Sequence, residues 1–235
     1  MTWEGRAAIV TGAGRGIGRA IAQALGREGM WVGLLGRRVP DLQTTAEEVR
    51  GAGGRPVVLQ ADVRDYASLE RAFQAFWDVT GRLDVLVNNA GIGIFRPVEE
   101  MTPEEFDDVV RTNLHGVFYC CKLAIPLMKR TGGGYIIQIG SLAGRNPIAG
   151  GAAYCASKFA VRGFSESLML EVRYDDIKVT TIAPGSVDTH FGGHSEGEAW
   201  KLRPTDVAQA VVDLLHTAPH ALTSYVELRP LKPRR

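Results

Sequence analysis

The sequence predicts one α/β domain, built on a doubly wound parallel sheet of about seven strands with helices on both faces. Short β-branched or apolar runs alternate with longer helical patterns along all 235 residues. The short runs are apolar on both faces, which is typical of parallel strands covered on two sides. We expect right-handed crossovers between them. We find no repeat, low-complexity linker or second domain, so residues 1–235 should form a single domain.

Seven runs are strand candidates, and a helical pattern follows each of the first six. The strand candidates are 7–10, 31–35, 56–60, 84–88, 135–139, 178–182 and 225–228. The helical patterns lie near 17–28, 41–52, 66–80, 103–130, 152–174 and 205–217. This alternation predicts repeated strand–helix units in one sheet.

The composition is typical of a soluble globular protein, with 45% hydrophobic and 23% charged residues. The formal net charge is +1, so no global field would attract nucleic acid or an anionic membrane. The odd set Cys120, Cys121 and Cys155 has no CxxC pair and indicates reduced, buried thiols in a cytoplasmic protein. Neither a signal-peptide core nor an apolar run of about 18 residues is present. We interpret the basic tail 229–235 as solvated.

The first strand runs directly into "TGAGRGIGRAIAQAL", a glycine-rich turn that opens a helix. Gly12 allows a tight turn, while Gly16 and Gly18 allow close approach of a pyrophosphate and of the helix to the strand. The helix N-terminus supplies N–H groups and partial positive charge to the phosphates. No GK[ST] follows, which excludes a P-loop. The context predicts a dinucleotide site, with an ordinary glycine-rich turn as the alternative.

The end of the second strand bears on which dinucleotide is bound. NAD-binding proteins place an acid about 20 residues after the glycines, where it binds the ribose 2′-OH. Here Gly36 stands at that point, Arg37 and Arg38 follow, and Arg15 should approach the same corner. With no acid in reach, guanidinium groups would favour a 2′-phosphate. We therefore expect NADP(H) to be favoured over NAD(H), unless these arginines are merely surface charges.

Tyr154 and Lys158 lie one helical turn apart among small residues, so they should share a helix face. A free phenol is a poor general base near neutrality, but a nearby ammonium should lower its pKa. Tyr154 could then exchange a proton during the interconversion of a hydroxyl and a carbonyl. Ser141 follows a parallel strand directly, at the end where ligands bind, and its hydroxyl can orient a carbonyl oxygen.

Further motifs stand in order around these residues. They are ADV (61–63), NNAG (88–91), TNLHGVF (112–118), IGS (139–141), YCASK (154–158) and APGSVDT (183–189). Together with TGAGRGIG (11–18), they make the chain resemble the short-chain dehydrogenase/reductase family over almost its whole length. It is similar to the short single-domain branch that includes 3-oxoacyl-carrier-protein reductases. The resemblance implies a Rossmann fold and an NAD(P)-dependent oxidoreductase acting on CH–OH and C=O groups.

By this resemblance, the catalytic residues are Asn113, Ser141, Tyr154 and Lys158. Tyr154 is the general acid/base, Lys158 tunes it and binds the nicotinamide ribose, Ser141 holds the substrate oxygen, and Asn113 bends its helix and anchors a water. Taken singly, Asn113 could be a tolerated helix residue, Asp62 a helix cap and Tyr154 a core tyrosine. Cofactor contacts, including the arginines above, are expected at Gly12, Gly14, Arg15, Gly16, Ile17, Gly18, Arg37, Arg38, Asp62, Val63, Asn89, Ala90, Gly91, Tyr154, Lys158, Pro184, Gly185, Val187 and Thr189.

The expected substrate lid, about residues 189–203, is short and glycine-rich. The walls of the substrate site should come from Ser141, Leu142, Ile148, Tyr154, Phe191 and Trp200, together with Ile92–Phe95 and the rest of the stretch 145–150. These residues suit a medium-sized, partly hydrophobic carbonyl or alcohol. His190 and His194 form an H-x3-H pair, but neither an acid nor a cysteine stands beside them, so we expect no metal.

Two alternative functions remain open. An epimerase or dehydratase on this fold usually needs a sizeable C-terminal substrate domain, for which the chain has no room. A non-catalytic sensor or scaffold would be suggested by loss of Tyr154 or Lys158, and both are present. By resemblance, the segments 103–130 and 152–174 should pair with their copies in a homodimer or homotetramer.

Overall fold

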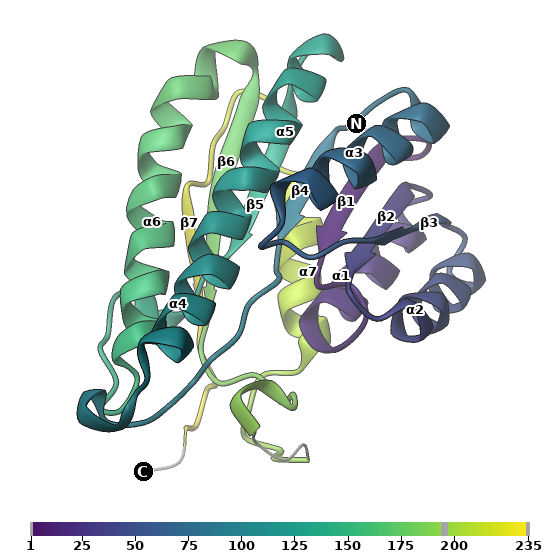
Figure 1. Cartoon of the computed structure of the whole chain (residues 1–235). Helices are drawn as coiled ribbons and strands as arrows, with labels where there is room; N and C mark the ends of the chain where they lie inside the picture. Colours follow the sequence, from purple (N-terminus) through teal and green to yellow (C-terminus); the bar gives the residue numbers. More distant parts are fainter. Residues whose placement is uncertain (1, 194–196, 234–235) are drawn as a thin grey trace.

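The computed structural model describes residues 2–193 and 197–233 as a sheet flanked by helices (Figure 1). The strands are β1 (Ala7–Thr11), β2 (Trp31–Gly36), β3 (Arg55–Gln60), β4 (Val85–Asn88), β5 (Gly134–Ile139), β6 (Ile177–Pro184) and β7 (Tyr225–Leu228). The α-helices are α1 (Gly16–Arg27), α2 (Val39–Gly51), α3 (Tyr66–Thr80), α4 (Pro103–Val110), α5 (Gly116–Arg130), α6 (Ala152–Val172) and α7 (Pro204–Leu215). Shorter helical turns are η1 (Val98–Glu100), η2 (Arg111–His115), η3 (Leu142–Gly144), η4 (Arg173–Asp175) and η5 (Phe191–Gly193).

All seven strands lie in one parallel sheet with the order β3-β2-β1-β4-β5-β6-β7. This confirms the predicted single-domain Rossmann fold. The order reverses between β1 and β4, which are neighbours although their onward connections run to opposite edges of the sheet. In open α/β sheets, ligands bind at such a switch point, outside the carboxyl ends of the strands.

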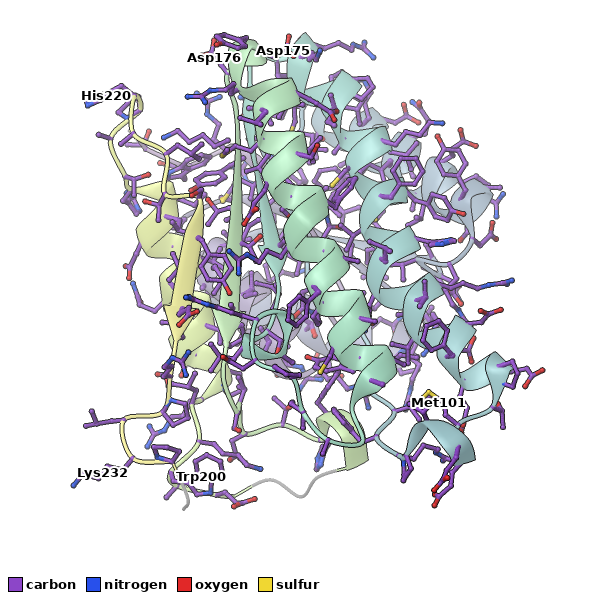
Figure 2. The ribbon with its side chains drawn as sticks, turned by 90° about the vertical axis from the view of Figure 1, so that its left-hand side faces the viewer. Met101, Asp175, Asp176, Trp200, His220 and Lys232 are labelled. Atoms are coloured by element: carbon purple, nitrogen blue, oxygen red, sulfur yellow. The ribbon has the colours of Figure 1, made fainter. Side chains whose placement is uncertain are left out.

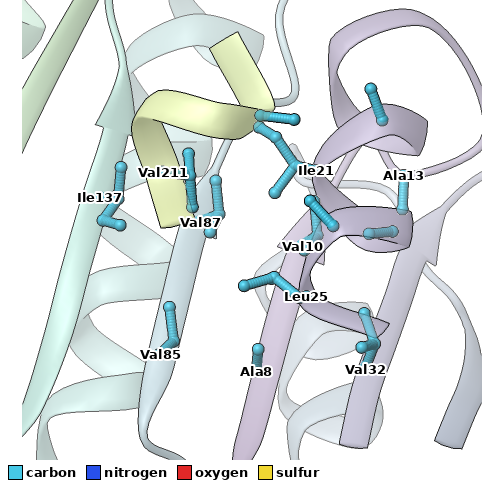
Figure 3. Close-up of a cluster of buried hydrophobic side chains, with 14 of the residues drawn as sticks. Ala8, Val10, Ala13, Ile21, Leu25, Val32, Val85, Val87, Ile137 and Val211 are labelled. Atoms are coloured by element: carbon cyan, nitrogen blue, oxygen red, sulfur yellow. The ribbon is translucent and has the colours of Figure 1, made fainter. Parts of the chain in front are cut away.

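The strands supply alternate side chains to two hydrophobic cores, one on each face of the sheet. In β1, Val10 faces the core beneath α1, α2 and α7, and Ile9 faces the core beneath α3, α5 and α6. Figure 3 shows Ile21 and Leu25 of α1 beside Val10 in the first core. Because both faces are covered, the strands are apolar throughout, as the sequence predicts.

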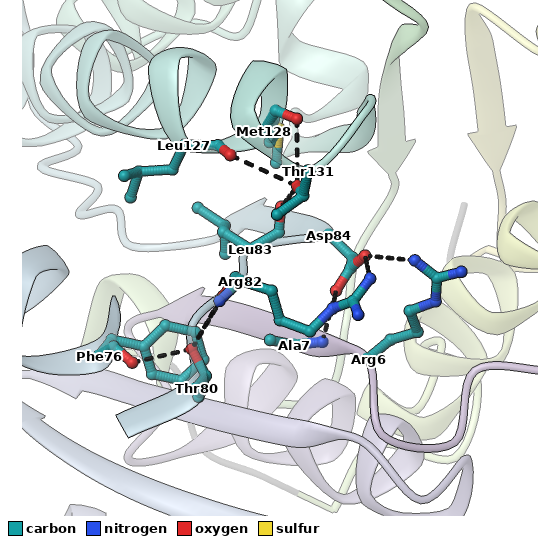
Figure 4. Close-up of polar contacts among 10 residues, drawn as sticks. All are labelled: Arg6, Ala7, Phe76, Thr80, Arg82, Leu83, Asp84, Leu127, Met128 and Thr131. Carbon is teal, nitrogen blue, oxygen red and sulfur yellow. Dashed lines mark hydrogen bonds and ion pairs between the residues drawn. The ribbon is translucent and has the colours of Figure 1, made fainter. Parts of the chain in front are cut away.

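The amino ends of the two central strands are tied together by Asp84 (Figure 4). Its carboxylate accepts hydrogen bonds from the backbone N–H of Ala7 (2.8 Å), from Arg6 (3.0 Å) and, through both oxygens, from Arg82 (2.7 Å each). Burial would raise the pKa of Asp84, but the hydrogen bonds from Arg82, Ala7 and Arg6 outweigh it and lower the pKa. This cluster fixes the end of the sheet opposite the ligand-binding edge.

The described residues of the predicted lid segment, 189–193 and 197–203, lie at the other end of the sheet. Figure 2 shows Trp200, in the lid, at the opposite end of the molecule from Asp175 and Asp176, which precede β6. The lid base is held by a bridge between Val187 and Leu202. The backbone N–H of Gly197 also donates to both carboxylate oxygens of Asp188, at 3.0 and 2.9 Å.

The predicted helix over 103–130 is wrong in one respect, because the structure divides it. The π-helical turn η2 separates α4 from α5. The π turn lies within a continuous helical path and contains neither Gly nor Pro, so no helix-breaking residue marks it in the sequence. At the junction, Gly116 lies so close to Val63 that an added Cβ would come within 2.9 Å of the Val63 Cβ. The wider turn therefore coincides with close packing against the segment after β3.

The three cysteines are free and buried, as predicted. Burial raises the pKa of the adjacent thiols of Cys120 and Cys121, so both stay protonated near neutral pH. Within residues 2–193 and 197–233, no helix is long and apolar enough to cross a membrane.

Candidate active site

The glycine loop after β1 has the geometry that the sequence predicts. Gly12 has a φ of +66°, and an added Cβ would lie 3.0 Å from both Ala90 Cα and Asn89 Nδ2. Gly18 lies against the carbonyl of Gly12, where a Cβ would overlap it. Gly16 has a φ of +53°. Glycine is therefore required here both by conformation and by close approach.

The loop is held in place by Thr11 and Asn89. The Thr11 hydroxyl accepts hydrogen bonds from the backbone N–H groups of Asn89 and Ala90, both at 3.0 Å. Asn89 Nδ2 donates to the Thr11 carbonyl at 2.9 Å. Helix α1 follows with Arg15 at its N-cap, no side-chain cap and no acidic residue in its first turn. Its N-terminus is therefore suited to an anionic group.

A cavity of about 1130 Å³ joins this loop to the lid along the carboxyl edge of the sheet. The predicted site residues that line it are Gly12, Gly14, Arg15, Gly16, Ile17, Arg37, Arg38, Asp62, Val63, Asn89, Ala90, Gly91, Ser141, Leu142, Ile148, Tyr154, Lys158, Pro184, Gly185, Val187, Thr189, Phe191 and Trp200. Two predicted residues lie behind the lining instead. Gly18 packs against the loop itself, and Asn113, 1% exposed, is covered by its partners.

Sequence reasoning missed several lining residues, among them Asp41, Thr112, Glu198 and Lys201. Asp41 follows Arg38 by three residues in the first turn of a helix, a spacing that allows an ion pair. Glu198 and Lys201 have the same spacing in the lid. The spacing of opposite charges three residues apart could therefore have predicted both ion pairs.

The expectation that no acid lies in reach of the arginine corner is wrong. Asp41 lines the cavity there, and its carboxylate pairs with Arg38 Nε at 3.2 Å. An added Cβ at Gly14 would come within 2.9 Å of the Asp41 Cβ, so the helix start and the glycine loop are in contact. Arg15 and Arg37 are exposed at the same corner. The pairing reduces the positive charge that Arg38 presents there.

Asp62 is not a helix cap, because Asp65 caps α3 by accepting from the backbone N–H of Ser68. Instead, both carboxylate oxygens of Asp62 accept from the Arg64 side chain at 2.8–3.2 Å. Burial would raise the pKa of Asp62, but the hydrogen bonds from Arg64 lower it overall. Arg64 also bonds Asp108 of α4 at 2.9 Å, and so ties the loop after β3 to α4.

The centre of the cavity contains Tyr154, Lys158 and Ser141. Lys158 Nζ donates to the carbonyl of Ile139, the last residue of β5, at 2.8 Å and lies 5.8 Å from the Tyr154 ring centroid. Burial lowers the pKa of Lys158 to about 8. Ser141 caps η3 by accepting from the N–H of Ala143 at 3.1 Å.

The expected lowering of the Tyr154 pKa is not found in this structure. Burial raises the pKa of Tyr154, a hydrogen bond with Ser141 opposes that rise, and Cys155 adds to it. The physical reason is that a phenolate loses its hydration here, while the Lys158 ammonium is directed to Ile139. Tyr154 therefore stays protonated near neutral pH.

Asn113 links the cavity wall to the helix that carries Tyr154. Its Oδ1 accepts from the N–H of Ile92 (2.8 Å), and its Nδ2 donates to the Ile92 carbonyl (2.9 Å) and to Ser157 Oγ (3.0 Å). Ser157 in turn donates to the Tyr154 carbonyl at 2.7 Å. The side chain thus binds protein groups through both ends of its amide and fixes the segment after β4 to α6.

The lid carries two of the predicted substrate contacts. Phe191 lies 5.5 Å from Tyr154 between ring centroids, and Trp200 Nε1 donates to Glu198 at 2.7 Å. Of the predicted histidine pair, His190 lines the cavity, and His194 lies outside the described residues. In the part of the chain that the structure describes, no group of three or more His, Cys, Asp or Glu side chains could hold a metal.

The short chain dehydrogenase family matches residues 6–199 of this chain, well over half of its length. The chain belongs to the short-chain dehydrogenase family. This short-chain dehydrogenase is 34% identical to a sepiapterin reductase of Chlorobaculum tepidum, over 94% of this chain and 95% of the relative. As the names of its relatives indicate, it is an oxidoreductase.

Two solved structures are similar in fold along nearly the whole chain. An alcohol dehydrogenase from the archaeon Thermococcus sibiricus, complexed with 5-hydroxy-NADP, has a TM-score of 0.92 and 33% identity, covering 98% of each chain. A metagenomic short-chain oxidoreductase in complex with NADP has a TM-score of 0.88 and 35% identity, covering 99% of this chain and 100% of that one.

Proposed function

We propose that this short-chain dehydrogenase is an NADP(H)-dependent reductase that converts a carbonyl substrate into a secondary alcohol, and the reverse. The observation that carries the proposal is the position of Tyr154 and Lys158. Both face one cavity from consecutive turns of α6, beside Ser141 at the carboxyl end of β5. This places a proton donor, a cation and a hydroxyl around one point.

The residues of the cavity fit a dinucleotide. The glycine loop leaves space that a Cβ at Gly12 or Gly16 would restrict, and the first turn of α1 has neither a side-chain cap nor an acid. The volume of about 1130 Å³ slightly exceeds the usual range of roughly 300–1000 Å³ for small-molecule sites, which suits a dinucleotide and a substrate together. The NADP and 5-hydroxy-NADP in two similar structures support the assignment.

When bound, the nicotinamide supplies or accepts a hydride at the substrate carbon. The residues of the chain supply the proton and orient the substrate. Ser141 hydrogen-bonds the substrate oxygen, and Tyr154 donates its proton to that oxygen during reduction. The Lys158 ammonium, 5.8 Å from the Tyr154 ring centroid, offsets part of the desolvation cost of the phenolate that remains. Because its raised pKa keeps Tyr154 protonated, the resting site is prepared for the reductive direction.

The preference for NADP(H) is supported by Arg15 and Arg37 at the far corner of the cavity. A guanidinium matches a phosphate in shape and charge. Asp41 opposes this preference through its pair with Arg38, so we propose a moderate preference only.

Replacement of Tyr154 by Phe tests the proposal. It removes the proton donor and leaves the ring, so NADPH binding should stay near normal while turnover falls by about 10²–10⁴-fold. NADPH affinity would be measured by fluorescence titration, and turnover by nicotinamide absorbance over a panel of carbonyls. Near-normal kcat in the Tyr154→Phe variant would contradict the assignment.

We further propose that the chain forms a homodimer or homotetramer through α5 and α6 and acts in the cytoplasm. Three phenylalanines on the α4–α5–α6 side are 43–46% exposed, namely Phe106, Phe118 and Phe159. Burial of such side chains against a second copy would stabilise an isologous interface. The three free cysteines support a reducing compartment. Light scattering that gives a monomer mass at micromolar concentration would refute the assembly.

A further inference from the structure

We propose that the substrate is a neutral carbonyl compound bearing an aromatic ring, and that Phe95 and Phe191 select it. The inference rests on the proposed reductase function and names its substrate class. The selecting residues surround Tyr154, where the substrate oxygen has to arrive.

Two phenylalanine rings flank the Tyr154 ring. The Phe95 centroid lies 5.4 Å from that of Tyr154 with an interplanar angle of 57°, and the Phe191 centroid lies 5.5 Å away at 55°. Both distances fall within the 4.5–7 Å range of favourable aromatic pairs. Phe95 comes from the segment after β4 and Phe191 from the lid, so the fold brings distant parts of the chain to one point.

Gly93 shows how closely the two rings approach each other. An added Cβ there would come within 2.7 Å of Phe95 Cε2 and 2.8 Å of Phe191 Cε1. The two rings therefore share one small region above the glycine. Any larger residue would push one of them away from Tyr154.

The exposed parts of these rings face an arriving ligand. Phe95 is 38% exposed and Phe191 is 37% exposed, and both line the cavity, whereas Tyr154 is only 8% exposed. A substrate therefore contacts ring surface before its oxygen reaches the hydroxyl. A flat apolar group covers this surface best, because ring edges and faces attract one another beyond simple burial.

The charges at this end of the cavity indicate that the substrate is neutral. Lys201 and Glu198 both line the cavity and pair at 2.9 Å, and Glu198 also accepts from Trp200. A carboxylate or phosphate on the substrate would have to compete with Glu198 for Lys201. The pair offers hydrogen bonds but little net charge, which disfavours an anionic ligand.

Two matched pairs of ketones test the proposal with NADPH. Benzylacetone and its cyclohexyl analogue carry the same methyl ketone on the same linker and differ in whether the remote ring is flat and aromatic. Methyl levulinate and levulinate differ in charge and in one ester methyl group. We expect kcat/KM to be about tenfold higher for benzylacetone than for the cyclohexyl analogue, as two aromatic contacts predict. Methyl levulinate should likewise exceed levulinate.

The variants Phe95→Leu and Phe191→Leu keep apolar bulk but lose the rings. Each should reduce the ratio of benzylacetone to cyclohexyl analogue by about threefold, and the double variant should bring it near one. Trp77→Leu is the control, because it removes an aromatic ring on α3 that lies outside the proposed subunit interface and does not line the cavity. It should leave the ratio unchanged.

The outcomes separate this inference from the proposed function. Two results count against the substrate class: NADPH is oxidised at equal rates with benzylacetone and its cyclohexyl analogue, or faster with levulinate than with methyl levulinate. Either result overturns the substrate class and leaves the reductase assignment intact. A ratio unchanged in both leucine variants overturns the role of the two phenylalanines. Absence of NADPH oxidation with every carbonyl overturns the reductase proposal itself.

Discussion

The side-chain amide of Asn113 donates a 3.0 Å hydrogen bond to the hydroxyl of Ser157, which itself donates to the carbonyl of Tyr154 at 2.7 Å. All three residues are buried. This chain of bonds connects the π-helical turn to the helix that carries the reacting phenol. Small displacements of a reacting group are costly to catalysis, so the connection should affect rate more than binding.

Ser157→Ala should therefore lower kcat by about tenfold while KM for NADPH changes little. Ser157→Thr, which keeps the hydroxyl, should restore most of the rate. Ser165→Ala is the matched control, because Ser165 is buried in the same helix and donates to the Val161 carbonyl at 2.7 Å, whereas the Asn113 amide hydrogen-bonds Ile92 and Ser157. An equal loss of kcat in both alanine variants would show that Ser157 only stabilises the helix and does not position Tyr154.

The pKa of Lys158 predicts the pH dependence of the enzyme. Burial lowers that pKa to about 8, so the ammonium exists below this pH and is lost above it. The Lys158 charge stabilises the developing phenolate. Because kcat/KM reports the groups of the free enzyme, kcat/KM for NADPH should fall as pH rises through about 8. Steady-state rates across this range would check it. A profile that is flat through pH 8 and falls only near the ordinary lysine value would contradict it.

The arginines at the far corner of the cavity predict a moderate preference for NADPH. The positive charge of Arg37 should increase the preference, and the negative charge of Asp41 should decrease it. We expect kcat/KM to favour NADPH over NADH by about tenfold, because solvent screens the contact. Arg37→Ala should bring the ratio close to one, and Asp41→Asn should raise it, since the acid no longer neutralises Arg38. Arg27→Ala, at an exposed arginine at the far end of α1, is the control. The ratio should also shrink as salt is added.

A reversal of this preference is also testable. Gly36→Asp combined with Arg37→Ile introduces an acceptor for the ribose 2′-OH and removes a cation. The added Cβ would meet only a methyl group of Leu42, at 3.2 Å, which can give way. We expect NADH to be preferred in this variant. A retained NADPH preference would show that cations other than Arg37 determine it.

Asp84 predicts the acid stability of the fold. Its folded-state pKa is lowered, so its contribution to the free energy of unfolding is present above its unfolded value near 3.8 and is lost as pH falls through the folded value. Asp84→Asn should lower the free energy of unfolding by about 2 kcal/mol at neutral pH, because the partly exposed Arg6 and Arg82 lose the charge of their buried partner. Asp78→Asn, at an exposed position on α3, should change it little. Urea denaturation of the unmodified protein and of the two variants measures both changes in the free energy of unfolding.

The sequence by itself determined the sheet, the glycine loop and the identities of Ser141, Tyr154 and Lys158. These features depend on local patterns, namely apolar runs, glycine spacing and a one-turn separation on a helix, and each is read from neighbouring residues. All seven predicted strands lie within two residues of those observed. The π-helical turn at Asn113 escaped prediction, because neither Gly nor Pro marks it as a break in the helix.

Only the tertiary structure decided what surrounds those residues. The pair of Asp41 with Arg38, the two rings beside Tyr154, the amide bonds of Asn113 and the pair of Glu198 with Lys201 arise from side-chain directions that spacing alone does not fix. The pKa of Tyr154 is the clearest case. The sequence placed an ammonium one turn away and suggested a lowered value, but the fold buries the phenol and directs the ammonium to a backbone carbonyl. Desolvation depends on every atom packed around a group, and a sequence motif specifies only a few of them.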